Sequence, residues 1–152
     1  MADQQDQKYE PRVAHLPWEL KRAERAMARL LDVKLRGTGL TKSQFGVIQA
    51  LEHMDKASSA ELARTVFVTP QAMVGLVTAL EEKGYIERTQ SEASARIIEA
   101  RLTSAGRAAW RRAVAKLAEI DQLLESEFST TDLVRLTRLL RRLAGPMDSD
   151  QD

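Results

Sequence analysis

One side of the segment 70–83 carries small, polar or uncharged side chains at the spacing of a helix face. They are Gln71, Val74, Gly75 and Thr78. A helix face that meets only water normally carries charge, whereas these groups let the base edges of a nucleic acid approach closely. The residues alone leave a plainer alternative, which is a generic helical hairpin with a polar outer face.

Arginines around a polar loop offer a second kind of contact. Arg96 lies at the base of the loop 90–95, and Arg88 and Arg101 lie on the segments that flank this loop. A guanidinium on a protruding hairpin suits a phosphate or the narrow, electronegative minor groove of DNA. The alternative is that these arginines are simply solvated.

Capping signals predict the pair of helices that holds the uncharged face. Ser58 and Glu61 form a capping box, in which each side chain satisfies a free backbone donor of the first helical turn. Thr69 is a good N-cap directly before Pro70, and Gly84 suits the left-handed residue that ends a helix. The helix 70–83 is expected to bury an apolar stripe of Ala72, Met73, Leu76, Val77 and Leu80.

A β-hairpin is expected after these two helices. Its strands are predicted over 85–89 and 96–102, joined by the polar tip 90–95. A hairpin in this position is a wing, so the segment 40–103 predicts a winged helix-turn-helix. The expected fold class is therefore mainly α with a small β-wing (α+β), in which helices from both ends of the chain flank the winged core.

One amphipathic helix is expected over 12–36 and two are expected over 104–144. The second of these two is capped by the segment from Ser129 to Asp132 and is predicted to stop at Gly145 and Pro146. A further helix opens at the capping box of Thr41 and Gln44. The apolar stripes of the flanking helices exceed what one small core covers, which favours a homodimer; the alternative is packing on their own subunit only. We expect one domain over 11–146, with disordered tails over 1–10 and 147–152.

Composition argues against catalysis and metal binding. The chain of 152 residues has no cysteine, and its two histidines, His15 and His53, lack any metal-ligand spacing. We expect no enzymatic activity, no metal and no cofactor. The sequence contains no long apolar run and no signal peptide, which predicts a soluble, cytoplasmic protein without a membrane partner. The net charge is only +1 because acidic ends offset a basic remainder, and the winged segment itself is close to neutral.

Several motifs in their order along the chain resemble the MarR family of bacterial transcriptional regulators. The likeness covers roughly residues 16 to 144, and the motifs are Leu40-Thr41, Gln44-Phe45-Gly46-Val47, Ala60-Glu61-Leu62-Ala63-Arg64, Val68-Thr69-Pro70-Gln71-Ala72-Met73, Leu80-Glu81-Glu82-Lys83-Gly84-Tyr85-Ile86-Glu87-Arg88 and Leu102-Thr103-Ser104-Ala105-Gly106-Arg107. The resemblance implies a homodimer whose terminal helices form the dimer interface. It also implies recognition helices in successive major grooves of double-stranded DNA, wings in the flanking minor grooves and a pseudo-palindromic operator.

The resemblance also implies which residues touch DNA. The matching positions on the recognition helix are Thr69, Pro70, Gln71, Ala72, Gly75 and Thr78, and Arg96 matches the wing arginine. Gln71 is the expected base reader, because its amide can pair at two points with adenine. Ser43 and Ser59 are expected to contact phosphate near helix N-termini.

The chain departs from the family pattern at two places. Ser94 and Ser91 stand where the family wing usually carries aspartates, so Arg96 lacks its usual carboxylate brace unless Glu92 substitutes, and a more mobile wing is expected. The family often has a basic residue late in the recognition helix, where this chain has Thr78 and Ala79. The phosphate contacts are therefore expected to spread onto Arg64, Lys42 and Arg88.

Many members of the family are repressors released by small phenolic or aromatic acids, and this implies an effector site between the dimer helices and the winged lobe. The candidate lining residues are Trp18, Arg22, Lys42, Phe45 and Trp110; the alternative is that the aromatic residues belong to the core. The sequence thus favours a dimeric DNA-binding repressor with such an effector. It leaves open an activator, a ligand-independent regulator and a winged-helix module for protein–protein assembly.

Overall fold

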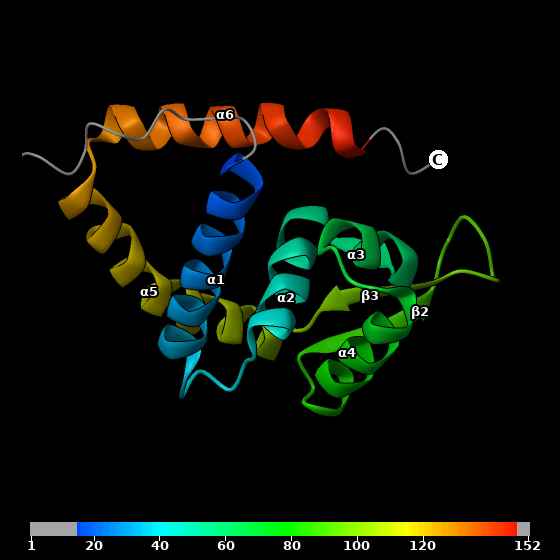
Figure 1. Cartoon of the computed structure of the whole chain (residues 1–152). Helices are drawn as coiled ribbons and strands as arrows, with labels where there is room; N and C mark the ends of the chain where they lie inside the picture. The colour runs from blue at the N-terminus through cyan, green and yellow to red at the C-terminus, as the bar shows by residue number, and fades with distance from the viewer. Residues whose placement is uncertain (1–14, 149–152) are drawn as a thin grey trace, which may run out of the picture.

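The computed structural model describes residues 15–148. The expected tail at 1–10 lies outside them, and so does the expected tail at 147–152 except for residues 147 and 148. Within the described residues the chain forms six helices and three short strands (Figure 1). The elements are α1 (Leu16–Leu35), α2 (Lys42–Met54), β1 (Lys56–Ser58), α3 (Ser59–Thr65), α4 (Pro70–Glu82), β2 (Ile86–Gln90), β3 (Ile98–Leu102), α5 (Ser104–Glu127) and α6 (Thr130–Asp148). The predicted fold class, mainly α with a small β-wing, is confirmed.

The three strands form one antiparallel sheet in the order β1-β3-β2. The hairpin of β2 and β3 pairs Ile86 with Leu102 and Gln90 with Ile98, so β3 begins two residues later than the predicted strand. Strand β1 was not predicted, because three residues are too few for an alternating pattern to stand out. Its central residue, Ala57, is buried opposite Ala100 of β3.

The core lies in the winged lobe, where α2 packs against α3, α4, the sheet and the first half of α5. Its largest fully buried side chains are Leu35, Val47, Ile48, Leu51, Leu62, Met73, Val77, Leu80 and Leu102. The predicted stripe on α4 is largely confirmed, since Met73, Val77 and Leu80 are buried and Leu76 is partly buried. Ala72 was wrongly assigned to that stripe: it is exposed, because it lies about 100° around the helix from Met73.

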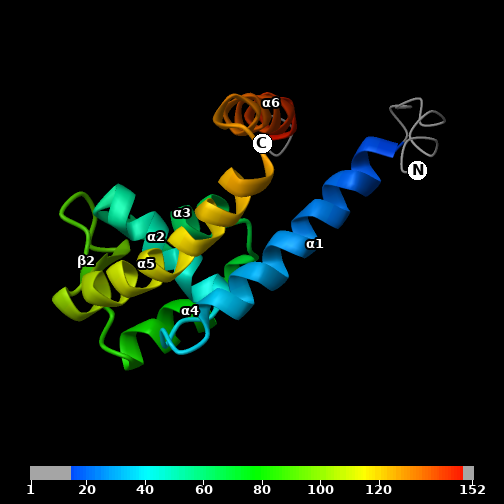
Figure 2. The same cartoon turned by 90° about the vertical axis from the view of Figure 1, so that its left-hand side faces the viewer.

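The terminal helices extend away from this lobe. In Figures 1 and 2, α1 projects outward from the lobe, and α6 lies at the far end of α5 from the sheet. An ion pair between the Lys34 Nζ and the Glu119 Oε2, 2.6 Å apart, ties α1 to α5. The hydrogen bond from Lys34 holds the pKa of the Glu119 carboxyl below its ordinary value.

The last helix is longer than predicted. It continues through Gly145 and Pro146 to Asp148, so the expected stop was wrong. The fixed backbone angle of proline is compatible with a helix, and its missing N–H removes only one hydrogen bond near the helix end. Gly145 and Pro146 are therefore unfavourable in the helix but do not end it.

The chain turns from α3 into α4 through a residue with an unusual backbone. Phe67 has a φ of +57°, in the left-handed region that normally favours glycine at the end of a helix. The N–H of Val68 then bonds to the carbonyl of Ala63 at 3.0 Å, which closes the end of α3. The Phe67 side chain is 83% exposed, so burial of the ring offsets little of the backbone strain.

Replacing Phe67 by glycine is expected to raise the free energy of unfolding by about 0.5–1 kcal/mol. The left-handed backbone costs a non-glycine residue about 1–2 kcal/mol, and the greater freedom of glycine in the unfolded chain offsets roughly half of that gain. Urea unfolding followed by circular dichroism measures the change. Phe67→Ala keeps the strain and serves as the matched control, and a lower stability for Phe67→Gly would contradict the expectation.

Candidate nucleic-acid interface

The two helices before the wing have the geometry of a helix-turn-helix. The chain bends by 109° between α3 and α4, within the range typical of that motif. The predicted capping box is confirmed: the Glu61 N–H donates to the Ser58 hydroxyl at 3.3 Å, and the Ser58 N–H donates to the Glu61 carboxylate at 2.8 Å. The hydrogen bonds from Ser58 hold the pKa of the Glu61 carboxyl below its ordinary value. The Thr69 hydroxyl caps α4 by accepting from the Ala72 N–H at 3.1 Å.

The uncharged face of α4 points away from the core. Gln71 and Gly75 are exposed, Val74 is 59% exposed and Thr78 is partly buried. Among the described residues, no side chain bonds to the Gln71 amide. Pro70 and Ala72 are also exposed, so the structure brings the predicted recognition-helix residues together on one accessible surface. Val74 belongs to this surface as well, although it was not among the predicted contacts.

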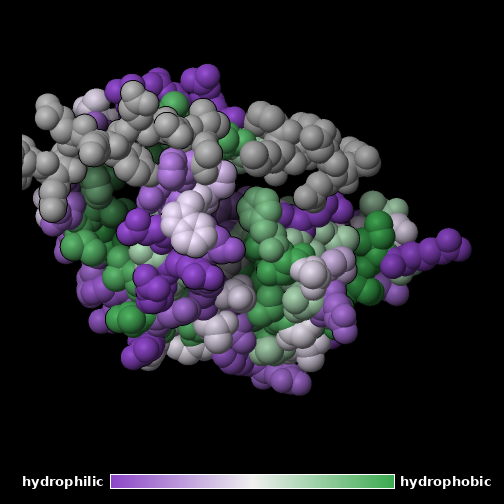
Figure 3. Space-filling view, in the orientation of Figure 1, coloured by the Kyte–Doolittle hydropathy of each residue, from purple (hydrophilic) through white to green (hydrophobic). Residues whose placement is uncertain are grey.

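The wing projects beyond the lobe, and its tip is hydrophilic in the space-filling view (Figure 3). The two serines that replace the family's aspartates shape the tip: the buried Ser91 hydroxyl donates to Glu99 Oε1 at 2.9 Å and accepts from the Ala93 N–H at 3.3 Å. The Ser94 hydroxyl accepts from the Arg96 N–H at 3.4 Å. Serine therefore holds the turn by short-range bonds without adding negative charge.

The arginines of the wing differ in their partners. Arg88 forms a close ion pair with Glu81 at the end of α4, and the hydrogen bond from Arg88 holds the pKa of that carboxyl below its ordinary value. The Arg101 Nε lies 2.5 Å from Glu87 Oε1. Within the described residues the Arg96 guanidinium pairs with no carboxylate, neither Glu92 nor another. Arg96 therefore presents its full charge near the tip, while the strand arginines are already compensated.

The predicted phosphate-contacting residues fall at two different places. Ser59, partly buried, opens α3, while Arg64 is exposed near its end. Ser43 lies in the first turn of α2. Lys83 holds this turn to the C-terminal end of α4, whereas α3 leads into the N-terminal end of α4. The Lys83 Nζ donates to the Gly39 carbonyl at 2.7 Å and to Gln44 Oε1 at 2.9 Å. This link between α4 and α2 was not predicted, because nothing in the local sequence reports a contact across 39 residues.

The predicted effector residues are only partly brought together in one subunit. Phe45 and Trp110 both pack against the core, and the Trp110 indole donates to Gln49 Oε1 at 2.8 Å, one turn along α2 from Phe45. Trp18, 66% exposed, and Arg22 lie in the first turns of α1. Since α1 has 20 residues and is about 30 Å long, these two lie far from the end of α1 that leads to Lys42.

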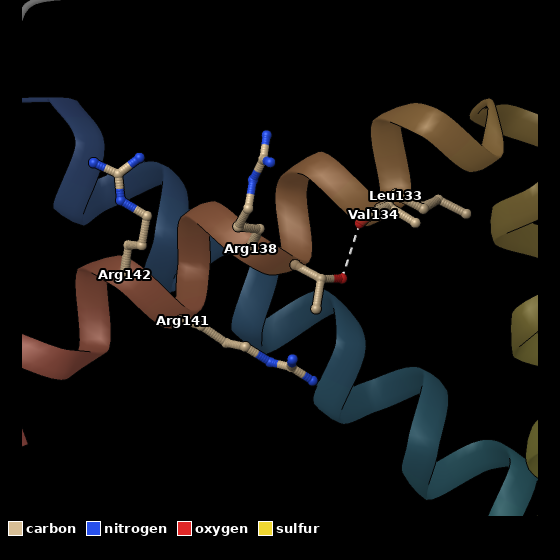
Figure 4. A pocket seen from close by; sticks show the side chains of 6 residues that line it. Leu133, Val134, Arg138, Arg141 and Arg142 are labelled. Carbon is tan, nitrogen blue, oxygen red and sulfur yellow. Dashed lines mark hydrogen bonds between the residues drawn. The ribbon is translucent and has the colours of Figure 1, made fainter.

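The surface hollows of the described residues include two that lie elsewhere, and neither is lined by the predicted effector residues. A hollow of about 470 Å³ lies between the end of α1 and α5, lined by Arg36, Gly37, Thr38, Arg112, Ala115, Lys116 and Glu119. A hollow of about 580 Å³ lies along α6, where Arg138, Arg141 and Arg142 follow Leu133 and Val134 (Figure 4). Neither of these two hollows is the effector site predicted from the sequence.

The part of the chain that the structure describes contains no single helix long and apolar enough to cross a membrane. Only α3 and α4 taken together reach that length and apolarity, and the chain bends by 109° between them.

Comparisons with known proteins agree on one group of relatives. A family model described as the MarR family matches residues 38–97. An HTH-type transcriptional repressor of Mycobacterium tuberculosis is 33% identical over 132 residues, which cover 87% of this chain and 95% of that repressor.

Two solved structures share the fold. A mutant of MarR from Escherichia coli in complex with operator DNA aligns with a TM-score of 0.77 at 22% identity, over 84% of this chain and 92% of that one. BpsR of Bordetella bronchiseptica, described as regulated in its DNA binding by 6-hydroxynicotinic acid, aligns with a TM-score of 0.77 at 21% identity, over 86% of this chain and 98% of its own. At these identities the two likenesses establish the fold.

Proposed function

Because this chain belongs to the MarR family, we propose that it is a dimeric, sequence-specific DNA-binding repressor released by a small aromatic or phenolic acid. The observation that carries the proposal is the exposed, uncharged face of α4, held on a capped helix beside a wing with one uncompensated arginine. This combination suits base edges in the major groove next to phosphates or a minor groove.

In this proposal α4 enters the major groove and Gln71 reads an adenine. Thr69, Ala72 and Thr78 flank Gln71 along the same contact, and Ser59 and Arg64 bind phosphate. Arg96 lies at the adjacent minor groove, where it neutralises a phosphate. Arg88 contributes to DNA binding only if it leaves Glu81, so its net contribution is expected to be small.

A second copy of the chain is the partner that the terminal helices favour. Exposed large apolar side chains are concentrated on these helices: Leu16, Trp18, Val33, Val114, Leu123, Phe128, Val134, Leu136, Leu139 and Leu140. Monomeric proteins rarely leave so much apolar surface in water. A two-fold dimer covers it and places two α4 helices on one duplex.

The effector site is proposed to be completed by the dimer. Lys42, Phe45 and Trp110 of one subunit supply a cation and apolar walls, and Trp18 and Arg22 come from α1 of the second subunit, because they lie too far away within one chain. An acid bound there lowers DNA affinity only if it binds the DNA-incompetent arrangement of the lobes more tightly. BpsR, whose DNA binding is described as regulated by 6-hydroxynicotinic acid, shares this fold.

A gel shift at fixed salt, with DNA from upstream of the protein's own gene, tests the proposal. Binding of that duplex in preference to a shuffled duplex, and its loss on adding salicylate-like acids, are the expected results. Absence of duplex binding by the intact dimer would favour the assembly module instead. Preferential binding that no acid from a broad panel relieves would leave a ligand-independent regulator.

Replacing Arg96 by alanine is expected to weaken binding to all duplexes by a similar factor. Because each wing then neutralises one phosphate fewer, the slope of log affinity against log salt falls by about 0.9 per subunit. Fluorescence anisotropy across a salt series measures both quantities. Arg101→Ala is the control, since Arg101 is already paired with Glu87; an Arg96→Ala effect confined to one sequence would contradict the phosphate role.

A further inference from the structure

We propose that Val74 contacts the C5-methyl group of a thymine in each half-site. We also propose that Gly75, which has no side chain, lets the helix approach the DNA closely enough for this contact to form. The proposal rests on the proposed DNA-binding function and adds a base-specific contact to it. Its two observations are independent: an exposed apolar side chain on the DNA-facing surface, and a helical glycine that the fold does not require.

Val74 is an apolar, β-branched residue at an exposed helix position, where it contributes little to the stability of the single subunit. It is 59% exposed in the middle of α4, and β-branched residues are less favourable in helices than alanine or the longer straight side chains. Three residues before it lies Gln71, and four residues after it lies Thr78, so all three share one face. An apolar side chain on a major-groove helix finds one matching apolar group there, the thymine methyl.

Gly75 is the sixth of thirteen residues in α4, and it does not have a positive φ. A Cβ atom at this position would meet nothing within 4 Å. Glycine in the interior of a helix is about 1 kcal/mol less favourable than alanine, and neither backbone conformation nor packing within the subunit explains its use here. An approaching partner does explain it, since the missing side chain brings the helix backbone closer to the groove floor.

Spacing places the thymine next to the adenine that Gln71 is proposed to read. Residues three apart on a helix are separated by roughly 4.5 Å along its axis, and successive bases on a strand are roughly 3.4 Å apart. Val74 and Gln71 therefore reach neighbouring base pairs. Each half-site is expected to contain a thymine methyl one base step from that adenine.

Removing single methyl groups from the DNA tests the contact. The preferred duplex is first selected from a random library with the intact protein, and each thymine is then replaced in turn by deoxyuridine, which lacks only the C5-methyl. In each half-site, one of these single replacements is expected to lower the affinity of the unaltered protein about three- to five-fold, which is the effect of one buried methyl group. The same replacement is expected to leave the affinity of Val74→Ala unchanged.

Two outcomes overturn the reading by Val74: no deoxyuridine position weakens binding, or the sensitive position stays equally sensitive in Val74→Ala. Both differ from failure of the proposed function, in which the library yields no preferred duplex at all. Alanine is more favourable than valine at an exposed helix position, so Val74→Ala is expected to fold.

A second variant tests Gly75 with two readouts of opposite sign. Gly75→Ala is expected to raise the midpoint of thermal unfolding and to lower affinity for the selected duplex at least ten-fold. Gly46→Ala is the control, because Gly46 is another helical glycine, on α2, at which a Cβ would make only ordinary contacts of 3.7 and 3.8 Å with Val66. Its midpoint is expected to rise without loss of affinity. Unchanged affinity in Gly75→Ala would overturn the close approach.

Discussion

Replacing Gly106 by alanine is expected to lower the free energy of unfolding by about 3 kcal/mol or more, the upper range for overpacking of a tight contact. A Cβ at this position would lie 2.0 Å from the Tyr85 carbonyl oxygen and 2.9 Å from its carbon. Both atoms belong to the backbone, so no side-chain rotation can relieve the collision. Either α5 or the chain at Tyr85 has to move.

Neither element is free to move, because several bonds hold this junction. The Thr103 hydroxyl donates to the Gly84 carbonyl at 2.6 Å, and the Thr103 N–H donates to the Tyr85 carbonyl at 3.1 Å. The same hydroxyl accepts from the Gly106 N–H at 3.0 Å, which caps α5. A shift of α5 therefore breaks bonds at the end of α4 and at the start of the wing together.

Urea unfolding at equal protein concentration measures the effect, since dimerisation makes stability depend on concentration. Gly46→Ala is again the matched control, because a Cβ there would make only ordinary contacts with Val66. An unfolding midpoint for Gly106→Ala equal to that of the unaltered protein would show that the junction yields without strain.

Replacing Gln71 by alanine is expected to remove most of the preference for the cognate base pair. A bidentate amide–adenine pair contributes about 1–3 kcal/mol of discrimination, and a symmetric dimer loses it in both half-sites. Gln71 is exposed on α4, so the exchange leaves the core untouched. The affinity ratio between the selected duplex and one with that adenine replaced in both half-sites should fall towards one.

The measurement is a competition titration with the two duplexes at fixed salt. Gln122→Ala, at an exposed position on α5, controls for the loss of an amide elsewhere and should keep the full ratio. An equal loss of affinity on every sequence by Gln71→Ala, with the ratio intact, would assign Gln71 to the backbone rather than to a base.

Features encoded by neighbouring residues were predicted well from the sequence. The capping boxes at Thr41 and Ser58, the cap at Thr69 and the buried stripe of α4 depend on spacings of three and four residues, and the structure confirms them. The uncharged outer face of α4 follows from the same periodicity. The fold and the exposed, uncharged face of α4 were therefore predictable.

Features that depend on distant contacts were not predictable. Strand β1 exists only because Ala57 pairs with Ala100, and Arg88 loses its free charge only because α4 ends beside β2 and brings Glu81 near it. The effector residues were grouped by chemical type, but Trp18 and Arg22 lie in the first turns of the long helix α1, far from the end that leads to Lys42. The chemical type of a side chain identifies it as a candidate for ligand binding, whereas the fold determines which candidate residues lie close together.

The junction of Tyr85 with Gly106 holds the start of α5 to the winged lobe. Helix α5 has 24 residues and is about 36 Å long. The winged lobe lies at its N-terminal end, and α6 follows its C-terminal end. A tilt of about 5° at the α6 end moves the opposite end by about 3 Å over that length. That displacement is close to one base step, so a change of angle too small to disturb any core contact can take α4 out of register with its groove.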